Sequence, residues 1–124
     1  MDVDMLRTED FFRQVNEAFF SGDIDFMEDI VTDDIVWHMI GSAPIHGKQA
    51  FMDAAFGIGV YTEMDFQIDT VISNGMEAAV KGTMTMPNKS GDFQTYAFCD
   101  FYRMDRQSGG KIQEMISFVI ELKQ

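Results

Sequence analysis

A chain of 124 residues can build one domain with its own core but not two, so we expect a single domain over residues 1–124. Its hydrophobic content of 46% excludes a disordered chain. Its formal net charge of −12 argues against binding to nucleic acid or to an anionic membrane, because both carry negative charge. Cys99 has no second cysteine to pair with, which fits a cytoplasmic protein. The sequence contains no signal-like leader and no apolar stretch of membrane-spanning length, so we expect no membrane segment.

Three helices are predicted in the first half of the chain, each by apolar residues that recur on one face. The first runs from about Met5 to Phe20. The second begins after Asp23 and ends before Thr32, and the third runs from Lys48 to about Phe56. Gly22 suits the left-handed position that closes the first helix, and Asp23 suits the N-cap of the second. A Thr-Asp-Asp segment should separate the second helix from a first strand over Ile35–Ile40.

Alternating apolar and polar residues predict strands in the second half. These strands are expected over Glu63–Ser73, Met76–Met86, Phe93–Met104 and Lys111–Leu122. Asn74-Gly75 is a strong hairpin signal between the first two of them. Helices followed by an antiparallel meander indicate an α+β domain, with the helices packed on one face of a curved sheet.

Asp100 is the first candidate for chemistry, because alternation places it on the same strand face as Tyr96, Phe98 and Tyr102. Burial of that face would raise the pKa of the carboxyl, and a protonated carboxyl can donate a hydrogen bond to a developing oxyanion. The alternatives are a structural ion pair or an exposed carboxylate.

His38 is the second candidate, because histidine titrates close to neutral pH and can act as a general base. A histidine in an apolar strand can equally be a core or interface residue. Alternation puts Trp37 and Met39 on the face opposite His38, so one set or the other faces inward. The spacing of His38 and His46 is poor for a metal site, so we expect no metal and no other cofactor.

Four short segments together resemble the nuclear transport factor 2-like superfamily, in its SnoaL-like and ketosteroid-isomerase-like branch. They are Ser21-Gly22-Asp23 with the hydrophobic stretch up to Thr32-Asp33-Asp34, Pro44-Ile45-His46-Gly47, Cys99 to Asp105 and Gly110 to Met115. The resemblance spans nearly the whole chain. It implies a cone-shaped fold, in which a strongly bent sheet wraps around a helix, an apolar pocket at the open end, and a homodimer formed through the outer sheet face.

The family's active-site residues carry over only in part. Asp100 is similar in position to the acid that donates to the oxyanion in steroid isomerases, a carboxyl that an apolar site keeps neutral. His38 stands where the isomerase has an aspartate base, and Val15 stands where it has a tyrosine. The resemblance therefore does not imply a true steroid isomerase. The pocket candidates are Trp37, Met39, Tyr96, Phe98, Tyr102, Val15 and Val119.

These residues suit cofactor-free acid-base catalysis on a small hydrophobic carbonyl compound, by isomerisation, dehydration or cyclisation, with Asp100 and His38 as catalytic residues. The alternative is a non-catalytic module of the same fold that binds a small ligand or dimerises. If His38 points away from the pocket, the site reduces to a pocket with one carboxyl.

Overall fold

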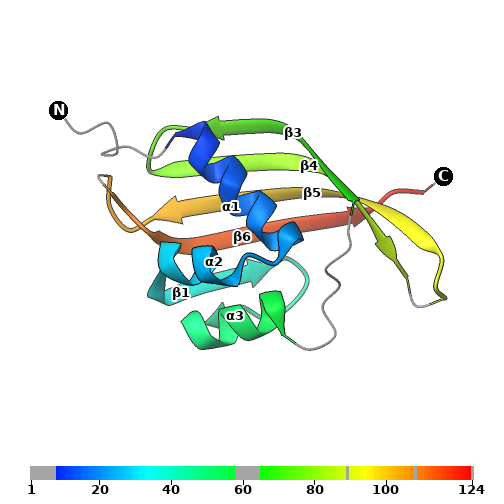
Figure 1. Cartoon of the computed structure of the whole chain (residues 1–124), viewed down its shortest axis with the longest axis horizontal. Coiled ribbons are helices and arrows are strands. Elements are labelled where there is room, and N and C mark those ends of the chain that lie inside the picture. The colour runs from blue at the N-terminus through cyan, green and yellow to red at the C-terminus, as the bar shows by residue number, and fades with distance from the viewer. Residues whose placement is uncertain (1–7, 58–64, 89, 108, 124) are drawn as a thin grey trace.

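The computed structural model describes residues 8–57, 65–88, 90–107 and 109–123. In these segments the elements are α1 (Glu9–Ser21), α2 (Ile24–Ile30), β1 (Val31–Met39), β2 (Ile45–His46), α3 (Lys48–Phe56), β3 (Asp65–Ser73), β4 (Glu77–Pro87), β5 (Phe93–Met104) and β6 (Ile112–Glu121). The strands form one open sheet in the order β2-β1-β6-β5-β4-β3 (Figure 1). β1 and β6 are parallel, whereas the other neighbours are antiparallel. The α+β class and the mostly antiparallel sheet are confirmed.

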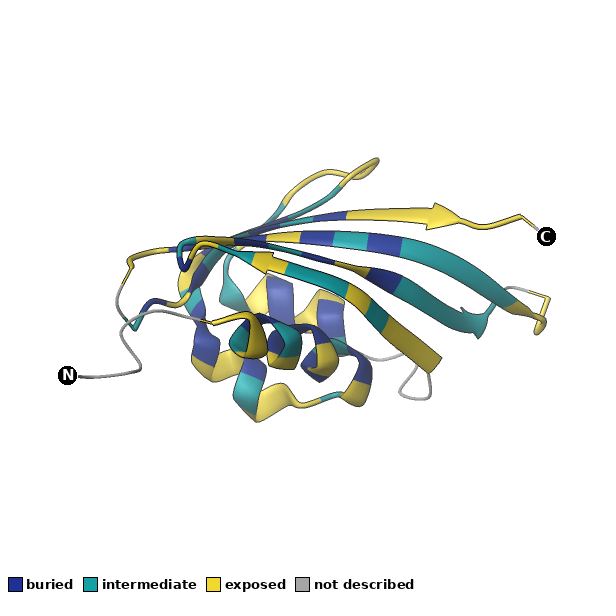
Figure 2. Cartoon of the chain, turned by 90° about the horizontal axis from the view of Figure 1, so that it is seen from above, coloured by how far each residue is buried: buried dark blue, intermediate teal, exposed yellow. Residues whose placement is uncertain are grey.

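The helices all lie on one side of the bent sheet, as Figure 2 shows. The buried core fills the space between the two layers. Its largest fully buried apolar side chains are Tyr102, Phe12, Phe51, Met27, Ile35, Met104 and Ile112. Within the described residues, no helix combines the length and apolar character needed to cross a membrane.

The ends of α1 and α2 follow from their capping residues. The Thr8 side chain accepts a hydrogen bond from the backbone N–H of Phe11, and Asp23 accepts one from Phe26 in the same way. Gly22 has a φ of 73°, the left-handed conformation that glycine adopts at little cost. The first helix was predicted from Met5, but residues 5–7 lie outside the described part of the chain.

The first strand begins earlier than predicted. β1 includes Thr32, Asp33 and Asp34, which were expected to separate the helix from the strand. Val31 pairs with Ile112, and the β1–β6 register shifts between Val31 and Val36. Because Asp33 and Asp34 are exposed, the strand tolerates them without burying a charge. The two-residue strand β2, which pairs with Val36 and Trp37, was not predicted, because it is too short to show an alternating pattern.

Strand β3 departs from the predicted alternation because its register with β4 shifts between Ile68 and Thr70. A bulge of this kind reverses the faces of the residues that follow it. As a result, Val71 packs against the core and Ile72 is 64% exposed. Residues 63 and 64, which were predicted to begin this strand, lie outside the described residues.

Strand β5 follows its predicted bounds and alternation. Phe98, Asp100 and Tyr102 are buried on the helix side, whereas Phe101 and Arg103 are exposed on the other. Strict alternation in β5 places the candidate carboxyl between the sheet and the helices.

Candidate functional site

A cavity of about 330 Å³ lies between the helices and the sheet. Side chains of α1, α3, β1, β4, β5 and β6 surround it: Asn16, Phe19, Phe20, Trp37, Met39, Ala54, Ala55, Met84, Met86, Phe98, Asp100, Met115, Ser117 and Val119. Within the described part of the chain, Asp100 is the one ionisable group in this lining, and Asn16 and Ser117 are the uncharged polar residues. The cavity is therefore an apolar chamber with a small polar region.

Asp100 is anchored in this polar region from two sides. Asn16 of α1 donates a hydrogen bond of 2.8 Å from Nδ2 to Oδ2 of Asp100. Ser117, the cross-strand neighbour of Asp100 on β6, also hydrogen bonds to the carboxyl. The Asp100 residue is only 8% exposed, so these contacts replace most of the water that a surface carboxylate would have.

Burial raises the pKa of Asp100 to about 6 from an ordinary value of 3.8, and the hydrogen bonds from Ser117 and Asn16 oppose that increase. With a pKa of about 6, the ionised form predominates at neutral pH and the protonated form remains accessible. A group in this range can both accept and return a proton under cellular conditions. The pKa moves in the expected direction, but not far enough to keep Asp100 protonated at neutral pH.

Tyr102 lies behind the polar region rather than in the cavity wall. Its hydroxyl oxygen accepts a second hydrogen bond, of 3.0 Å, from Nδ2 of Asn16. Burial first, and the nearby charge of Asp100 second, raise the pKa of Tyr102 well above its ordinary value, so the phenol remains neutral. Tyr102 can therefore help to hold Asn16 in position.

Trp37 and Ser117 form the other support of the carboxyl. Nε1 of Trp37 donates a hydrogen bond of 2.9 Å to Oγ of Ser117. Since the Ser117 oxygen accepts from Trp37, its hydroxyl hydrogen is available for Asp100. The indole also packs against the ring of Phe51, with centroids 5.3 Å apart, which connects the polar support to the core.

Four of the seven predicted pocket residues border the cavity, together with Asp100: Trp37, Met39, Phe98 and Val119. Val15 is fully buried in the core, and neither it nor Tyr96 or Tyr102 is among the lining residues.

His38 is not in the lining either. It alternates with Trp37 and Met39 on β1, so it occupies the opposite face of the strand, in register with Ile116 of β6. The structure therefore does not bring His38 and Asp100 together, and the site is the simpler of the two that were expected: a pocket with one carboxyl.

Sequence reasoning missed Asn16 and Ser117, the two direct partners of Asp100. Each carries a signal that could have been noticed. Asn16 is a polar residue within the apolar stripe of α1, four positions after Phe12 and four before Phe20. Ser117 occupies an inward position of β6, between Met115 and Val119.

No group of three or more His, Cys, Asp or Glu side chains in the described residues is arranged to hold a metal ion. Among the described residues, the polar region of the cavity contains one carboxyl, one amide and one hydroxyl, and the carboxyl is a group that can accept and return a proton.

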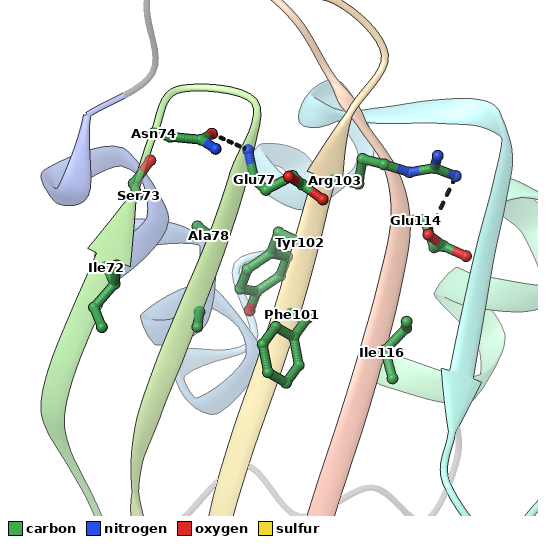
Figure 3. Close-up of a pocket in the computed structure, with 11 residues that line it drawn as sticks. Ile72, Ser73, Asn74, Glu77, Ala78, Phe101, Tyr102, Arg103, Glu114 and Ile116 are labelled. Carbon is green, nitrogen blue, oxygen red and sulfur yellow. Dashed lines mark hydrogen bonds and ion pairs between the residues drawn. The ribbon is translucent and has the colours of Figure 1, made fainter.

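A second concavity, of about 450 Å³, lies on the opposite face of the sheet (Figure 3). Its lining includes Phe101 and Ile72, which are 44% and 64% exposed. Nη2 of Arg103 and Oε1 of Glu114 form an ion pair of 3.1 Å at its border. Asp100 is not part of this lining, so the outer concavity and the cavity beneath the helices are separate features.

Comparison with known proteins assigns the chain to a family. Residues 12–115 match the SnoaL-like domain. The chain belongs to the SnoaL-like family. No curated protein matches its sequence.

Solved structures of SnoaL-like and related proteins share the fold at low sequence identity. A nuclear transport factor 2-like protein of unknown function from Cytophaga hutchinsonii is 22% identical, with a TM-score of 0.74 over 92% of this chain and 100% of that chain. A putative SnoaL-like polyketide cyclase from Jannaschia sp. is 14% identical, with a TM-score of 0.73 over 96% and 90% of the two chains. An epoxide hydrolase from M. tuberculosis, described as LEH-like, is 14% identical, with a TM-score of 0.67 over 83% and 74%.

Proposed function

We propose that this SnoaL-like protein binds a small hydrophobic carbonyl compound in the cavity beneath its helices and transfers a proton on it without a cofactor. Asp100 is the proposed catalytic residue. The observation that carries the proposal is a buried carboxyl, with a pKa of about 6, in the small polar region of a mostly apolar chamber.

One carboxyl is sufficient for an isomerisation. On a ketone with a C=C bond between its β- and γ-carbons, the Asp100 carboxylate takes a proton from the α-carbon, and the electron pair of that C–H bond moves to form a dienolate. The protonated Asp100 then returns the proton to the γ-carbon, which shifts the C=C bond into conjugation and restores both the carboxylate and the carbonyl. No second acid or base is consumed, so the reaction does not require His38 in the cavity.

A non-catalytic ligand-binding module is the second candidate. It is favoured by the two hydrogen bonds that hold Asp100, because a carboxylate fixed in this way could serve only to orient a polar group of the ligand. Against it, two of the similar structures are described as a putative SnoaL-like polyketide cyclase and an LEH-like epoxide hydrolase.

Hydrogen–deuterium exchange on carbon separates the two candidates. 2-Indanone, a small apolar ketone, is incubated with the protein in D₂O, and deuterium uptake next to the carbonyl is followed by NMR. We expect the wild-type protein to accelerate exchange and Asp100→Asn to lose the acceleration while still binding the ketone, because the amide has similar shape but cannot accept the proton.

Asp69→Asn is the matched control, since Asp69 is an exposed carboxylate on β3. This variant should exchange the ketone like the wild type. Binding of 2-indanone without accelerated exchange would favour the non-catalytic module, whereas absence of binding would contradict both candidates.

We also propose that the protein is a cytoplasmic homodimer that associates through the outer face of the sheet. The exposed side chains Ile72, Phe101, Phe118 and Ile120 belong to strands of this face. Arg103 and Glu114 supply opposite charges on it, so a second copy related by a two-fold axis could pair them reciprocally. The single cysteine is compatible with a reducing cytoplasm.

A further inference from the structure

Within the described part of the chain, the Asp100 carboxylate is a buried negative charge without a positive partner. At neutral pH it is mostly ionised, since its pKa is about 6. Among the described residues that border the cavity there is no lysine, arginine or histidine. The influences on the pKa of Asp100 are burial and the hydrogen bonds from Ser117 and Asn16, not a neighbouring cation. A buried charge is disfavoured unless it is paired, and folding has already removed water from this one, so a cation that enters the cavity gains an ion pair there.

The carboxylate can still accept hydrogen bonds from the cavity. A carboxylate has about four acceptor positions. Asn16 donates to Oδ2 over 2.8 Å, and Ser117 also hydrogen bonds to the carboxyl, so these two residues leave positions open. Asp100 borders the cavity and is 8% exposed, so a molecule inside can reach those positions. A primary ammonium group has three donors and the opposite charge, which suits it to this acceptor.

Aromatic rings form much of the remaining cavity wall. Two contacting pairs belong to the lining: Phe19 and Trp37, with centroids 5.7 Å apart, and Phe20 and Phe98, with centroids 5.6 Å apart. The faces of such rings attract cations, and their carbon atoms pack against an apolar ligand. The net charge of −12 also attracts cations to the protein and repels anions. The cavity therefore suits a molecule that joins an ammonium group to an apolar body.

We propose that the cavity binds small apolar primary amines in their protonated form, with the ammonium group donating to the Asp100 carboxylate and the hydrocarbon body lying among the Phe, Trp and Met side chains. This inference goes beyond the proposed function, because it adds a second class of ligand and requires no proton transfer on carbon. The two proposals share the cavity and the carboxyl, and each can fail without the other.

Three indane derivatives that differ in charge test the inference. At neutral pH 2-aminoindane is a cation, 2-methylindane is uncharged and indane-2-carboxylate is an anion. Trp37 borders the cavity and is the one tryptophan of the chain, so its fluorescence reports binding. We expect 2-aminoindane to bind about tenfold to a hundredfold more tightly than 2-methylindane, the range for hydrogen bonds to a charged group, and the anion to bind more weakly than either.

Asp100→Asn separates the ion pair from the general attraction of cations to an acidic protein. It keeps the shape of the side chain and removes its charge, so it should bind 2-aminoindane only as tightly as 2-methylindane. Asp69→Asn is the matched control, because it also removes one negative charge, but from an exposed position on β3. It should bind 2-aminoindane like the wild type. An equal loss of affinity in both variants, or no loss in either, would overturn the inference.

The pH dependence of binding tests the wild-type protein without any variant. The side chains that α1, β4 and β6 place beside Asp100 do not titrate: Asn16, Val80 and Ser117. On its own strand, Cys99 and Tyr102 have raised pKa values and stay neutral. As the pH falls below about 6, Asp100 becomes protonated, so the affinity for 2-aminoindane should fall about tenfold per pH unit while that for 2-methylindane stays constant. An affinity for the amine that does not change with pH would contradict the ion pair.

The results also separate this inference from the proposed function. If 2-aminoindane binds no more tightly than 2-methylindane while 2-indanone undergoes accelerated exchange, the inference is wrong and the proposed function stands. If 2-aminoindane binds as expected and 2-indanone is not exchanged faster, the inference stands and the proposed proton transfer fails.

Discussion

Asn16, in the first helix, donates a 2.8 Å hydrogen bond to Asp100, which lies 84 positions later in the chain. This contact joins the helix layer to the sheet at the point where the Asp100 carboxyl borders the cavity. It connects the stability of the fold to the protonation of the site, because the same bond that holds the helix against β5 also favours the charged form of Asp100.

Removing the charge of Asp100 should change how stability depends on pH. The pKa of Asp100 is about 6 in the folded protein against an ordinary value of 3.8, so folding favours the protonated carboxyl. Its stabilising contribution is complete below the lower value and is lost as the pH rises through the higher one. At about 1.4 kcal/mol per pH unit, the loss amounts to about 3 kcal/mol. Between about pH 4 and about pH 8, the free energy of unfolding of Asp100→Asn in urea should increase by this amount relative to that of the wild type. Parallel pH dependences of the two proteins would contradict this prediction.

Loss of Ser117 should raise the pKa of Asp100 further. The Ser117 hydrogen bond favours the ionised carboxyl, so in Ser117→Ala we expect an increase of about one pH unit. A ¹³C NMR titration of the Asp100 side chain measures the change. Ser73→Ala, at the far end of β3, should leave the pKa as it is in the wild type. A decrease in Ser117→Ala would show that the serine does not donate to the carboxyl.

His38→Ala should retain the rate of proton exchange on a bound ketone and its pH dependence. His38 does not border the cavity, and the two residues beside it do. The exchange experiment with 2-indanone, run over a range of pH, measures both quantities. A loss of rate comparable to that in Asp100→Asn would mean that the histidine reaches the substrate after all.

Gly82→Ala should destabilise the fold by about 1–3 kcal/mol, the usual cost of inserting a group into filled space. A Cβ atom on Gly82 would lie 2.0 Å from the carbonyl oxygen of Gln67 and 2.9 Å from Cζ of Phe98, a residue of the cavity wall. Thermal unfolding measures the loss. Gly109→Ala is the comparison, because its Cβ meets nothing within 4 Å and the cost there is only that of its positive φ. A Gly82 variant as stable as the wild type would show that β3 can move aside.

Phe101→Glu should weaken the proposed dimer. It places a charge among the exposed apolar side chains of the outer face, in the concavity bordered by Arg103 and Glu114. Sedimentation at micromolar concentration should show a shift to monomer. Phe93→Glu changes a more exposed phenylalanine, 74% against 44%, outside this concavity, and should remain a dimer. A wild-type monomer would contradict the proposal directly.

The sequence was most informative where one residue determines local geometry. Asp23 and Gly22 define the boundary between α1 and α2, and unbroken alternation in β5 placed Asp100 on the buried face. Sequence periodicity failed at the shifts of register, because a bulge changes which face a side chain occupies without changing the composition of the strand. Ile72 became exposed for this reason.

The candidate site was predicted in part. Asp100 was found from its own strand, since its surroundings along the chain are aromatic. Its partners Asn16 and Ser117 come from elements distant in sequence, and no local pattern specifies which residue of a helix meets which residue of a strand. The inward side of β1 was left open between His38 and its neighbours for the same reason: both faces of that strand carry apolar residues.

The position of β6 in the sheet has a consequence for how the protein can be built. The last strand in sequence lies between β1 and β5 and supplies Ser117, Met115 and Val119 to the cavity. During synthesis, the ribosome therefore makes β1 to β5 before β6, the strand that joins β1 to β5. Until β6 is added, β1 has no link to the main meander and the carboxyl lacks one of its two supports. The cavity is therefore incomplete until β6 has been made, so a chain truncated before Ile112 would lose the proposed site as a whole.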